Sequence, residues 1–321
     1  MGDKSKIQWT NATWNPVTGC SKVSAGCRGC YAERHALRFW GDRKFTDVRT
    51  HMEKLEQPLR WKRPRLIFVN SMSDLFHEDV PDEFIKHVFN VMHRAQHHTF
   101  QILTKRPERM HAFMMRYREV MPLPNVWLGV SIEDQQTAVL RIPWLSNTPA
   151  AVRFISAEPL LGHIDITAAM LSKRIHWVIV GGESGPTARP CHPNWVRIIR
   201  HQCNFFGVPF FFKQWGQWKP VTRDPHARKM MLNHPDKYHV WPDEGHESTV
   251  SIRCRKSDAG NELDGKYHME FPRGVDVQRI EYSRQDQFSF GGEQGTSTPP
   301  PGPSLTGQRG VVECKGSATQ R

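Results

Sequence analysis

Short apolar segments recur along the first 220 residues, and segments with a helical pattern separate them. Each apolar segment is rich in β-branched and aromatic residues, without alternation of apolar and polar positions, which is typical of strands buried on both faces. They span residues 65–70, 100–104, 126–131, 152–156, 177–181 and 208–213. Two of the intervals place apolar residues at helical spacing, over 84–95 and 110–117. This alternation predicts repeated βα units around a parallel sheet.

The residues at the strand ends decide between two kinds of parallel sheet. A first strand is expected near Ile7–Trp14, which brings the number of strands to seven. Polar or charged residues follow the other strands, at 70–74, 104–106, 131–134, 156–158, 181–183 and 213–214. A doubly wound sheet builds its site mainly at one switch point, whereas a barrel brings every strand end to one mouth. We therefore predict an α/β fold, a partial (β/α) TIM-like barrel.

The pattern changes twice toward the carboxyl end, which suggests three parts. Residues 1–219 carry the predicted barrel, and residues 220–272 form a Pro- and His-containing extension that we expect to be irregular and to pack on the barrel. Residues 273–321 include the run 289–310, which is rich in Gly, Pro, Ser and Thr. Because such a run buries too little apolar surface to offset its ordering entropy, we predict a flexible low-complexity tail.

The charge of the chain is concentrated in the predicted barrel. The chain has 321 residues and a formal net charge of +12, with 30 Lys and Arg against 18 Asp and Glu in residues 1–220. This excess suits an anionic partner, and the basic runs 60–65 and 104–109 suit a phosphate backbone. We therefore prefer a nucleic acid or nucleotide as substrate, and leave a small metabolite or another protein open. The sequence shows no transmembrane segment and no apolar signal region, so we expect a cytoplasmic protein.

Three of the seven cysteines lie close together in a Gly-rich loop after the first predicted strand. Cys20, Cys27 and Cys30 have the spacing C-x6-C-x2-C, which in a reducing compartment indicates a metal site rather than disulfides. Three thiolates suit a [4Fe–4S] cluster with one open iron, and a Cys3His zinc site that includes His35 is the alternative, with buried thiols as a third. We favour the cluster because a chain with its own core does not need a zinc ion to fold.

The motifs around this loop resemble two known groups of proteins. A three-cysteine loop after the first strand of a partial barrel resembles the radical S-adenosylmethionine enzymes. More closely, the chain is similar to a bacterial and phage family of three-Cys-motif proteins of unresolved function over about residues 5–272. The motifs that carry this similarity are TWNPVTGC, CYAE, NSMSDLFHE, LTKRPER, WLGVSIED, ISAEPLLG, VIVGGESGP, FFKQWG and LDGKYHMEFP. The usual radical loop is C-x3-C-x2-C with an aromatic residue before the last cysteine, whereas here Gly29 precedes Cys30 and Tyr31 follows it.

The resemblance implies an activity, its cofactors and its partners. It implies an iron–sulfur enzyme that uses S-adenosylmethionine to generate a 5′-deoxyadenosyl radical, with an electron donor and a separately encoded three-Cys-motif protein as partners. A zinc-stabilised, non-catalytic nucleic-acid-binding or adaptor protein is the alternative. The metal ligands are then Cys20, Cys27 and Cys30.

The resemblance also implies roles for residues at the predicted strand ends. The segment with Asn70, Ser71, Ser73 and Asp74 is expected to hold the amino group of the cofactor, and Arg106 or Lys105 its carboxylate. Ser131 and Glu133 are expected at the ribose, and Gly181 and Gly182 beside the adenine or a phosphate. Glu158, Glu183 and Lys105 are the expected catalytic residues at the mouth.

Overall fold

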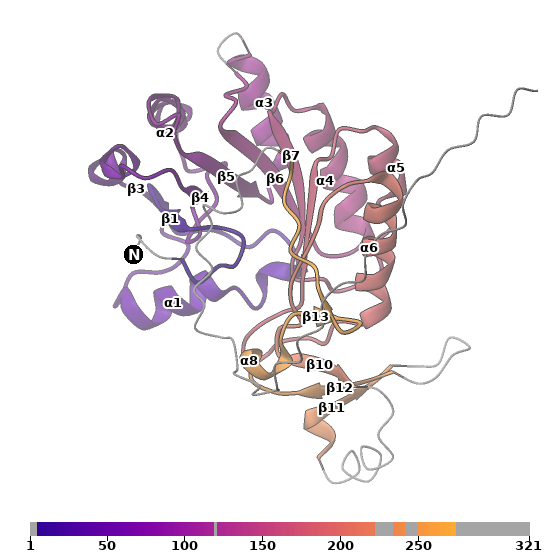
Figure 1. Ribbon diagram of the computed structural model, residues 1–321. Coiled ribbons are helices and arrows are strands. Elements are labelled where there is room, and N and C mark those ends of the chain that lie inside the picture. Colours follow the sequence, from indigo (N-terminus) through magenta and orange to yellow (C-terminus); the bar gives the residue numbers. More distant parts are fainter. Residues whose placement is uncertain (1–4, 119–120, 222–233, 242–248, 274–321) are drawn as a thin grey trace, which may run out of the picture. The chain divides into compact units, whose positions relative to one another are not determined.

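The computed structural model describes residues 5–118, 121–221, 234–241 and 249–273. At its centre is a seven-stranded sheet in which every neighbouring pair of strands is parallel (Figure 1). In spatial order the strands are β1 (Ala12–Trp14), β4 (Leu66–Val69), β5 (Thr99–Thr104), β6 (Val126–Ile132), β7 (Val152–Ala157), β8 (Trp177–Gly181) and β9 (Phe210–Gln214). The predicted parallel sheet is therefore confirmed, with a shorter first strand than expected.

The order of the strands identifies the architecture. The strands lie side by side in the order in which the chain makes them, as in a (β/α) barrel, and not in the reversed order of a doubly wound sheet. Within the described residues β9 does not pair with β1, so the sheet curls into a half-barrel with an open side. The predicted partial TIM-like barrel is confirmed.

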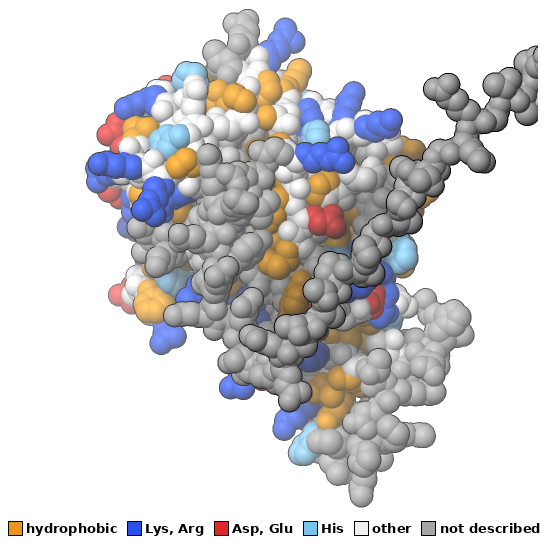
Figure 2. All heavy atoms as spheres, viewed as in Figure 1, with side chains coloured by type: hydrophobic (Ala, Val, Ile, Leu, Met, Phe, Trp, Pro, Cys, Tyr) orange, Lys and Arg blue, Asp and Glu red, His pale blue; other side chains and the backbone are white. Residues whose placement is uncertain are grey.

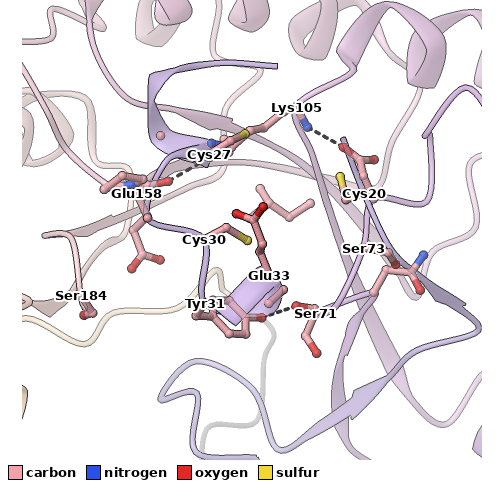
Figure 3. A pocket seen from close by; sticks show the side chains of 18 of the residues that line it. Cys20, Cys27, Cys30, Tyr31, Glu33, Ser71, Ser73, Lys105, Glu158 and Ser184 are labelled. Atoms are coloured by element: carbon pink, nitrogen blue, oxygen red, sulfur yellow. Dashed lines mark hydrogen bonds between the residues drawn. The ribbon is translucent and has the colours of Figure 1, made fainter. Parts of the chain in front are cut away.

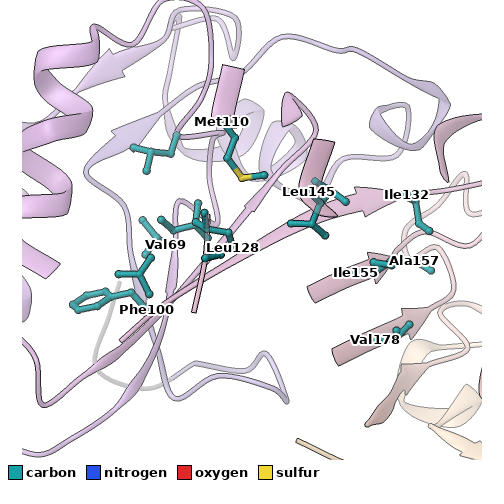
Figure 4. Close-up of a cluster of buried hydrophobic side chains, with 14 of the residues drawn as sticks. Val69, Phe100, Met110, Leu128, Ile132, Leu145, Ile155, Ala157 and Val178 are labelled. Carbon is teal, nitrogen blue, oxygen red and sulfur yellow. The ribbon is translucent and has the colours of Figure 1, made fainter. Parts of the chain in front are cut away.

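Helices cover the outer face of this sheet (Figure 1). The α-helices of the barrel are α1 (Tyr31–Phe39), α2 (Asp82–Arg94), α3 (Pro107–Arg116), α4 (Gln135–Asn147), α5 (Thr167–Leu171) and α6 (Pro193–Phe206). Short 3-10 helices are η1 (Ala25–Cys27), η2 (Met52–Lys54), η3 (Gln57–Arg60) and η4 (Pro235–Lys237). Alternate strand residues such as Val69, Leu128 and Val178 pack against helix residues such as Met110 and Leu145 (Figure 4). This layer is the larger hydrophobic core.

The inner face of the half-barrel is lined with aromatic side chains. Trp9, Phe154, Trp177 and Phe211 belong to a second buried cluster that contains no helix residue. The chain returns to complete this cluster: Phe271 packs on the Trp177 ring at 5.1 Å between centroids, and Trp177 Nε1 donates to the Glu270 carbonyl at 2.8 Å. The end of the described chain therefore fills the interior of the half-barrel.

The extension is more regular than its sequence pattern indicates. Its strands are β10 (Trp218–Val221), β11 (Tyr238–Val240) and β12 (Val250–Arg253), which form an antiparallel sheet. After them come the short helix α8 (Lys256–Ala259) and the hairpin of β13 (Glu262–Leu263) and β14 (Lys266–Tyr267), and β2 (Val17–Thr18) pairs with β3 (Arg49–Thr50) near the amino end. The division into parts 1–219 and 220–272 stays a prediction, and residues 274–321 of the predicted tail lie outside the described residues. No helix in the described ranges is long and apolar enough to span a membrane.

Candidate functional site

A cavity of about 420 Å³ lies at the carboxyl ends of the strands, where the sequence places the polar residues. Most of the predicted site residues line it, namely Cys20, Cys27, Cys30, Asn70, Ser71, Ser73, Asp74, Lys105, Arg106, Ser131, Glu158, Gly182 and Glu183. Glu133 and Gly181 are not among the lining residues. The strand ends thus converge on one space, as a barrel requires.

The three cysteines enter this space from a loop between β2 and α1. Figure 3 shows the thiols of Cys20, Cys27 and Cys30 around the same space. Cys27 ends η1, and Cys30 is the residue before the first turn of α1. The loop begins at Gly19, whose φ of 97° favours glycine and where a Cβ would come within 2.5 Å of the Asp47 carbonyl oxygen.

A buried carboxylate at the end of β6 holds the middle of this loop. Glu133 has no exposed surface, and it accepts hydrogen bonds from Ser24 Oγ at 2.6 Å and from the Gly26 N–H at 3.0 Å. Two cationic groups also donate to Glu133 Oε1: Lys105 Nζ, and Arg141 Nη1 at 3.4 Å. Burial tends to raise the pKa of Glu133, but Lys105 and the hydrogen bonds outweigh it and lower the pKa. Glu133 is therefore an ionised anchor behind the loop.

A second carboxylate, at the end of β8, holds the other half of the loop. Glu183 accepts from Arg189 Nη2 at 2.6 Å and Nε at 2.8 Å, and the same guanidinium donates to the Ala25 carbonyl at 2.9 Å. A Cβ on Gly29 would lie 2.7 Å from Glu183 Oε1, just as a Cβ on Gly26 would lie 2.5 Å from Glu133 Cδ. The two glycines therefore make room for the two carboxylates that hold the loop.

The thiols differ in how readily they ionise. Burial tends to raise the pKa of Cys27, but the Lys105 ammonium and hydrogen bonds from Val23 and Ser24 lower it below its ordinary value. Burial, reinforced by Asp74, raises the pKa of Cys20 to about 12, although Arg106 Nη1 donates to its sulfur at 3.7 Å. Because a thiolate is the metal-binding form, Cys27 is poised to bind and Cys20 must lose a proton when it does.

The segment after β4 forms one wall of the cavity. Asn70 has a φ of 60°, and its Oδ1 accepts from the Val17 N–H at 3.2 Å. Its buried Nδ2 has no hydrogen-bond partner within the described residues. The Ser71 carbonyl accepts from the Tyr31 hydroxyl, and Ser73 Oγ donates to the Val17 carbonyl at 2.8 Å. Asn70 Nδ2 is thus a side-chain donor on this wall whose hydrogen bond the described residues do not supply.

Asp74 and Arg106 join this wall to the end of β5. Asp74 accepts from Thr104 Oγ1 at 2.7 and 2.9 Å and from the Lys105 N–H at 3.0 Å. Arg106 donates to Glu78 Oε2 at 2.7 Å and to Ser21 Oγ at 2.7 Å. The run 104–109, predicted to suit a phosphate backbone, is engaged with carboxylates and with the cysteine loop.

The opposite wall comes from β6, β7, β8 and β9. Ser131 Oγ donates to the Glu158 carbonyl at 3.0 Å, and the Glu158 carboxylate lies 2.9 Å from Lys213 Nζ. A Cβ on Gly181 would meet Glu158 Oε1 at 2.5 Å, and one on Gly182 would meet the Trp215 carbonyl oxygen at 2.0 Å. Close packing within the chain is thus sufficient to explain why both positions are glycine.

The three thiols meet one requirement of an iron–sulfur cluster. In the described part of the chain, no three His, Cys, Asp or Glu side chains are arranged to hold one metal ion, and His35 does not line the cavity. The cysteines of an iron–sulfur cubane bind separate irons, so they need to surround a common space rather than meet at a point. Three thiols around one cavity, in a loop held from behind, meet that requirement.

The sequence reasoning did not identify several residues of the site. These residues are Arg189, Lys213, Lys256 and Tyr31. Of them, only Lys213 could have been recognised from the sequence, because it is a charged residue at the end of a predicted strand.

Comparisons with known proteins give a family and a set of distant structures. The family model described as "Protein of unknown function (DUF5131)" matches residues 4–272. No curated protein matches the chain. Among solved structures, spore photoproduct lyase complexed with dinucleoside spore photoproduct is similar at 12% identity and a TM-score of 0.43, covering 79% of this chain and 71% of that one. A mutant of that lyase with bound AdoMet and dinucleoside spore photoproduct has 12% identity and a TM-score of 0.41, with the same coverage. At these scores the strand order, and not the likeness, carries the fold assignment.

Proposed function

The chain belongs to the DUF5131 family, whose function is unknown, and from its own site we propose that it is a radical-SAM-like iron–sulfur enzyme. The single observation that carries this proposal is the placement of Cys20, Cys27 and Cys30 around one cavity at the strand ends of a partial barrel. Cys20, Cys27 and Cys30 would hold a [4Fe–4S] cluster, which, once reduced by an electron donor, would supply the electron for cleavage of S-adenosylmethionine into methionine and a 5′-deoxyadenosyl radical. We propose a nucleic acid or nucleotide as its substrate.

The protein's own part in this function is to hold, orient and exclude water. Glu133 and Glu183 hold the cysteine loop from behind, which fixes the positions of the thiols. Asn70 lines the cavity, and its Nδ2, without a partner within the described residues, supports a role for Asn70 in holding the bound cofactor. Asp74 and Arg106 form a paired unit beside Cys20, which keeps the wall between β4 and β5 rigid.

Anaerobic purification tests the metal centre. We expect a brown protein with about four irons per chain, because three thiolates and an open iron describe a cubane. Cys20→Ala, Cys27→Ala and Cys30→Ala should each remove the colour. Cys203→Ala is the matched control, since Cys203 is buried in α6 outside the cavity, and it should keep the colour. A colourless wild type with one zinc per chain contradicts the proposal.

The activity needs its own test. The reduced, iron-loaded protein is incubated with S-adenosylmethionine, and 5′-deoxyadenosine is measured. Its formation in wild type and Cys203→Ala, and its loss in the three cysteine variants, supports the function. An iron-loaded wild type that forms none contradicts it.

A further inference from the structure

Lys256 reaches the barrel cavity from the carboxyl-terminal extension. It is the first residue of α8 and lines the same cavity as the cysteines. The α8 segment is attached to the end of β9 by two hydrogen bonds of Trp215, from its N–H to the Gly260 carbonyl at 3.1 Å and from Nε1 to the Glu262 carbonyl at 2.8 Å. The extension therefore contributes a cation to the mouth of the barrel.

Most of the charged side chains that line the cavity form ion pairs. Lys22 pairs with Glu33 at 2.9 Å, Arg106 with Asp74 at 3.4 Å, and Lys105 with Glu133. Among the described residues, no carboxylate forms an ion pair with Lys256 or with Lys6, the other such cation of the lining. An ammonium that lines a cavity without a carboxylate at ion-pair distance is a site for an anionic group.

Lys256 and Lys213 line the same cavity as Glu158. Glu158 pairs with Lys213 at 2.9 Å, and it also acts on Lys256. Burial and then the Lys213 ammonium lower the pKa of Lys256, while Glu158 only partly opposes them. Two ammonium groups and one carboxylate on this part of the lining leave an excess positive charge, and a ligand with negative charge there stabilises both.

We propose that Lys256 and Lys213 bind a phosphate group of a nucleotide or nucleic acid substrate. This inference rests on the proposed function, because it takes the cavity as the site where the substrate binds. A lysine ammonium is a compact point charge that suits phosphate oxygens. The Tyr31 ring lines the same cavity with 51% of the residue exposed, and so offers a surface on which a base stacks. The net charge of +12 favours approach of such a polyanion.

Anisotropy of a labelled, mixed-sequence single-stranded DNA decamer measures this binding. Lys256→Gln should weaken binding about five-fold and reduce the salt slope by about 0.7, the value for one phosphate contact on a single strand. Lys266→Gln is the matched control, since it is an exposed lysine of the same extension outside the cavity, and it should bind as wild type does. A decamer with an uncharged methylphosphonate backbone should bind wild type and Lys256→Gln equally.

Each result decides for or against the inference. Equal affinity of Lys256→Gln and Lys266→Gln, or no binding of the DNA by wild type, overturns it. Iron content is measured on the same samples, so the two proposals fail separately. A weakened Lys256→Gln in a protein that binds no iron keeps the phosphate site and rejects the iron–sulfur function. If Lys256→Gln binds the DNA as wild type does, in a protein that holds iron and forms 5′-deoxyadenosine, the phosphate site is rejected and the iron–sulfur function is kept.

Discussion

Replacing Gly26 by alanine tests how the cysteine loop is held. The new Cβ would lie 2.5 Å from Glu133 Cδ and 2.6 Å from its Cγ, and Glu133 has no exposed surface into which it could move. Overpacking of this kind costs about 1–3 kcal/mol, and loss of the Gly26 hydrogen bond to a charged acceptor costs about 1.5–3 kcal/mol. Because the two costs overlap, we expect about 3 kcal/mol, which corresponds to a roughly 100-fold loss in the affinity of the loop for iron.

The assay is the iron content after anaerobic reconstitution at limiting iron, together with the melting temperature. By the usual scaling, about 3 kcal/mol lowers Tm by about 6–12 °C. Gly162→Ala is the matched control, since its Cβ would meet only Asp134, whose nearest atom, Cβ, lies at an ordinary 3.5 Å. Adding Glu133→Asp to Gly26→Ala removes one methylene from the clash and should restore part of the iron. Full iron and an unchanged Tm in Gly26→Ala would refute the reasoning.

Three further predictions concern the thiols, the interior and the buried carboxylate. In metal-free protein, Cys27 should be alkylated by iodoacetamide at lower pH than Cys20, because its pKa is lowered and that of Cys20 is raised to about 12; equal pH profiles by peptide mapping would contradict this. Phe271→Ala should cost about 3–5 kcal/mol in urea unfolding, the range for a buried aromatic residue, while Phe205→Ala, at an 84% exposed site, should cost almost nothing. Glu133→Gln should lower the free energy of unfolding at neutral pH, because the pKa of Glu133 is lower in the folded than in the unfolded protein and its carboxylate therefore stabilises the fold. This difference from wild type should shrink as the pH falls below about 4.3, the unperturbed pKa of Glu. A difference that does not depend on pH would argue against an ionised Glu133.

The sequence was sufficient for the barrel because its signals are local. Buried parallel strands such as Val126–Ile132 show as continuous apolar runs, and polar residues at every strand end indicate a shared mouth. The cysteine spacing likewise placed three thiols in one loop. These features need only short-range patterns or a regular topology.

The rest depends on contacts between distant parts of the chain. Glu133 directly follows β6, and no local pattern shows that its carboxylate lies behind the cysteine loop and accepts a hydrogen bond from Ser24. No local pattern shows that the space left by Gly26 and Gly29 is occupied by carboxylates of the protein itself. Lys256 stands in a segment without any periodic signal, so its place at the mouth emerges only from the packing of α8.

The late return of the chain into the half-barrel has a consequence for biosynthesis. All seven parallel strands have left the ribosome before the residues around Met269 and Phe271, which fill the concave side. Until then tryptophan and phenylalanine rings of the nascent polypeptide are exposed to solvent, and such a state is prone to aggregate or to bind chaperones. Translation must therefore pass Phe271 before the concave side of the half-barrel can be filled.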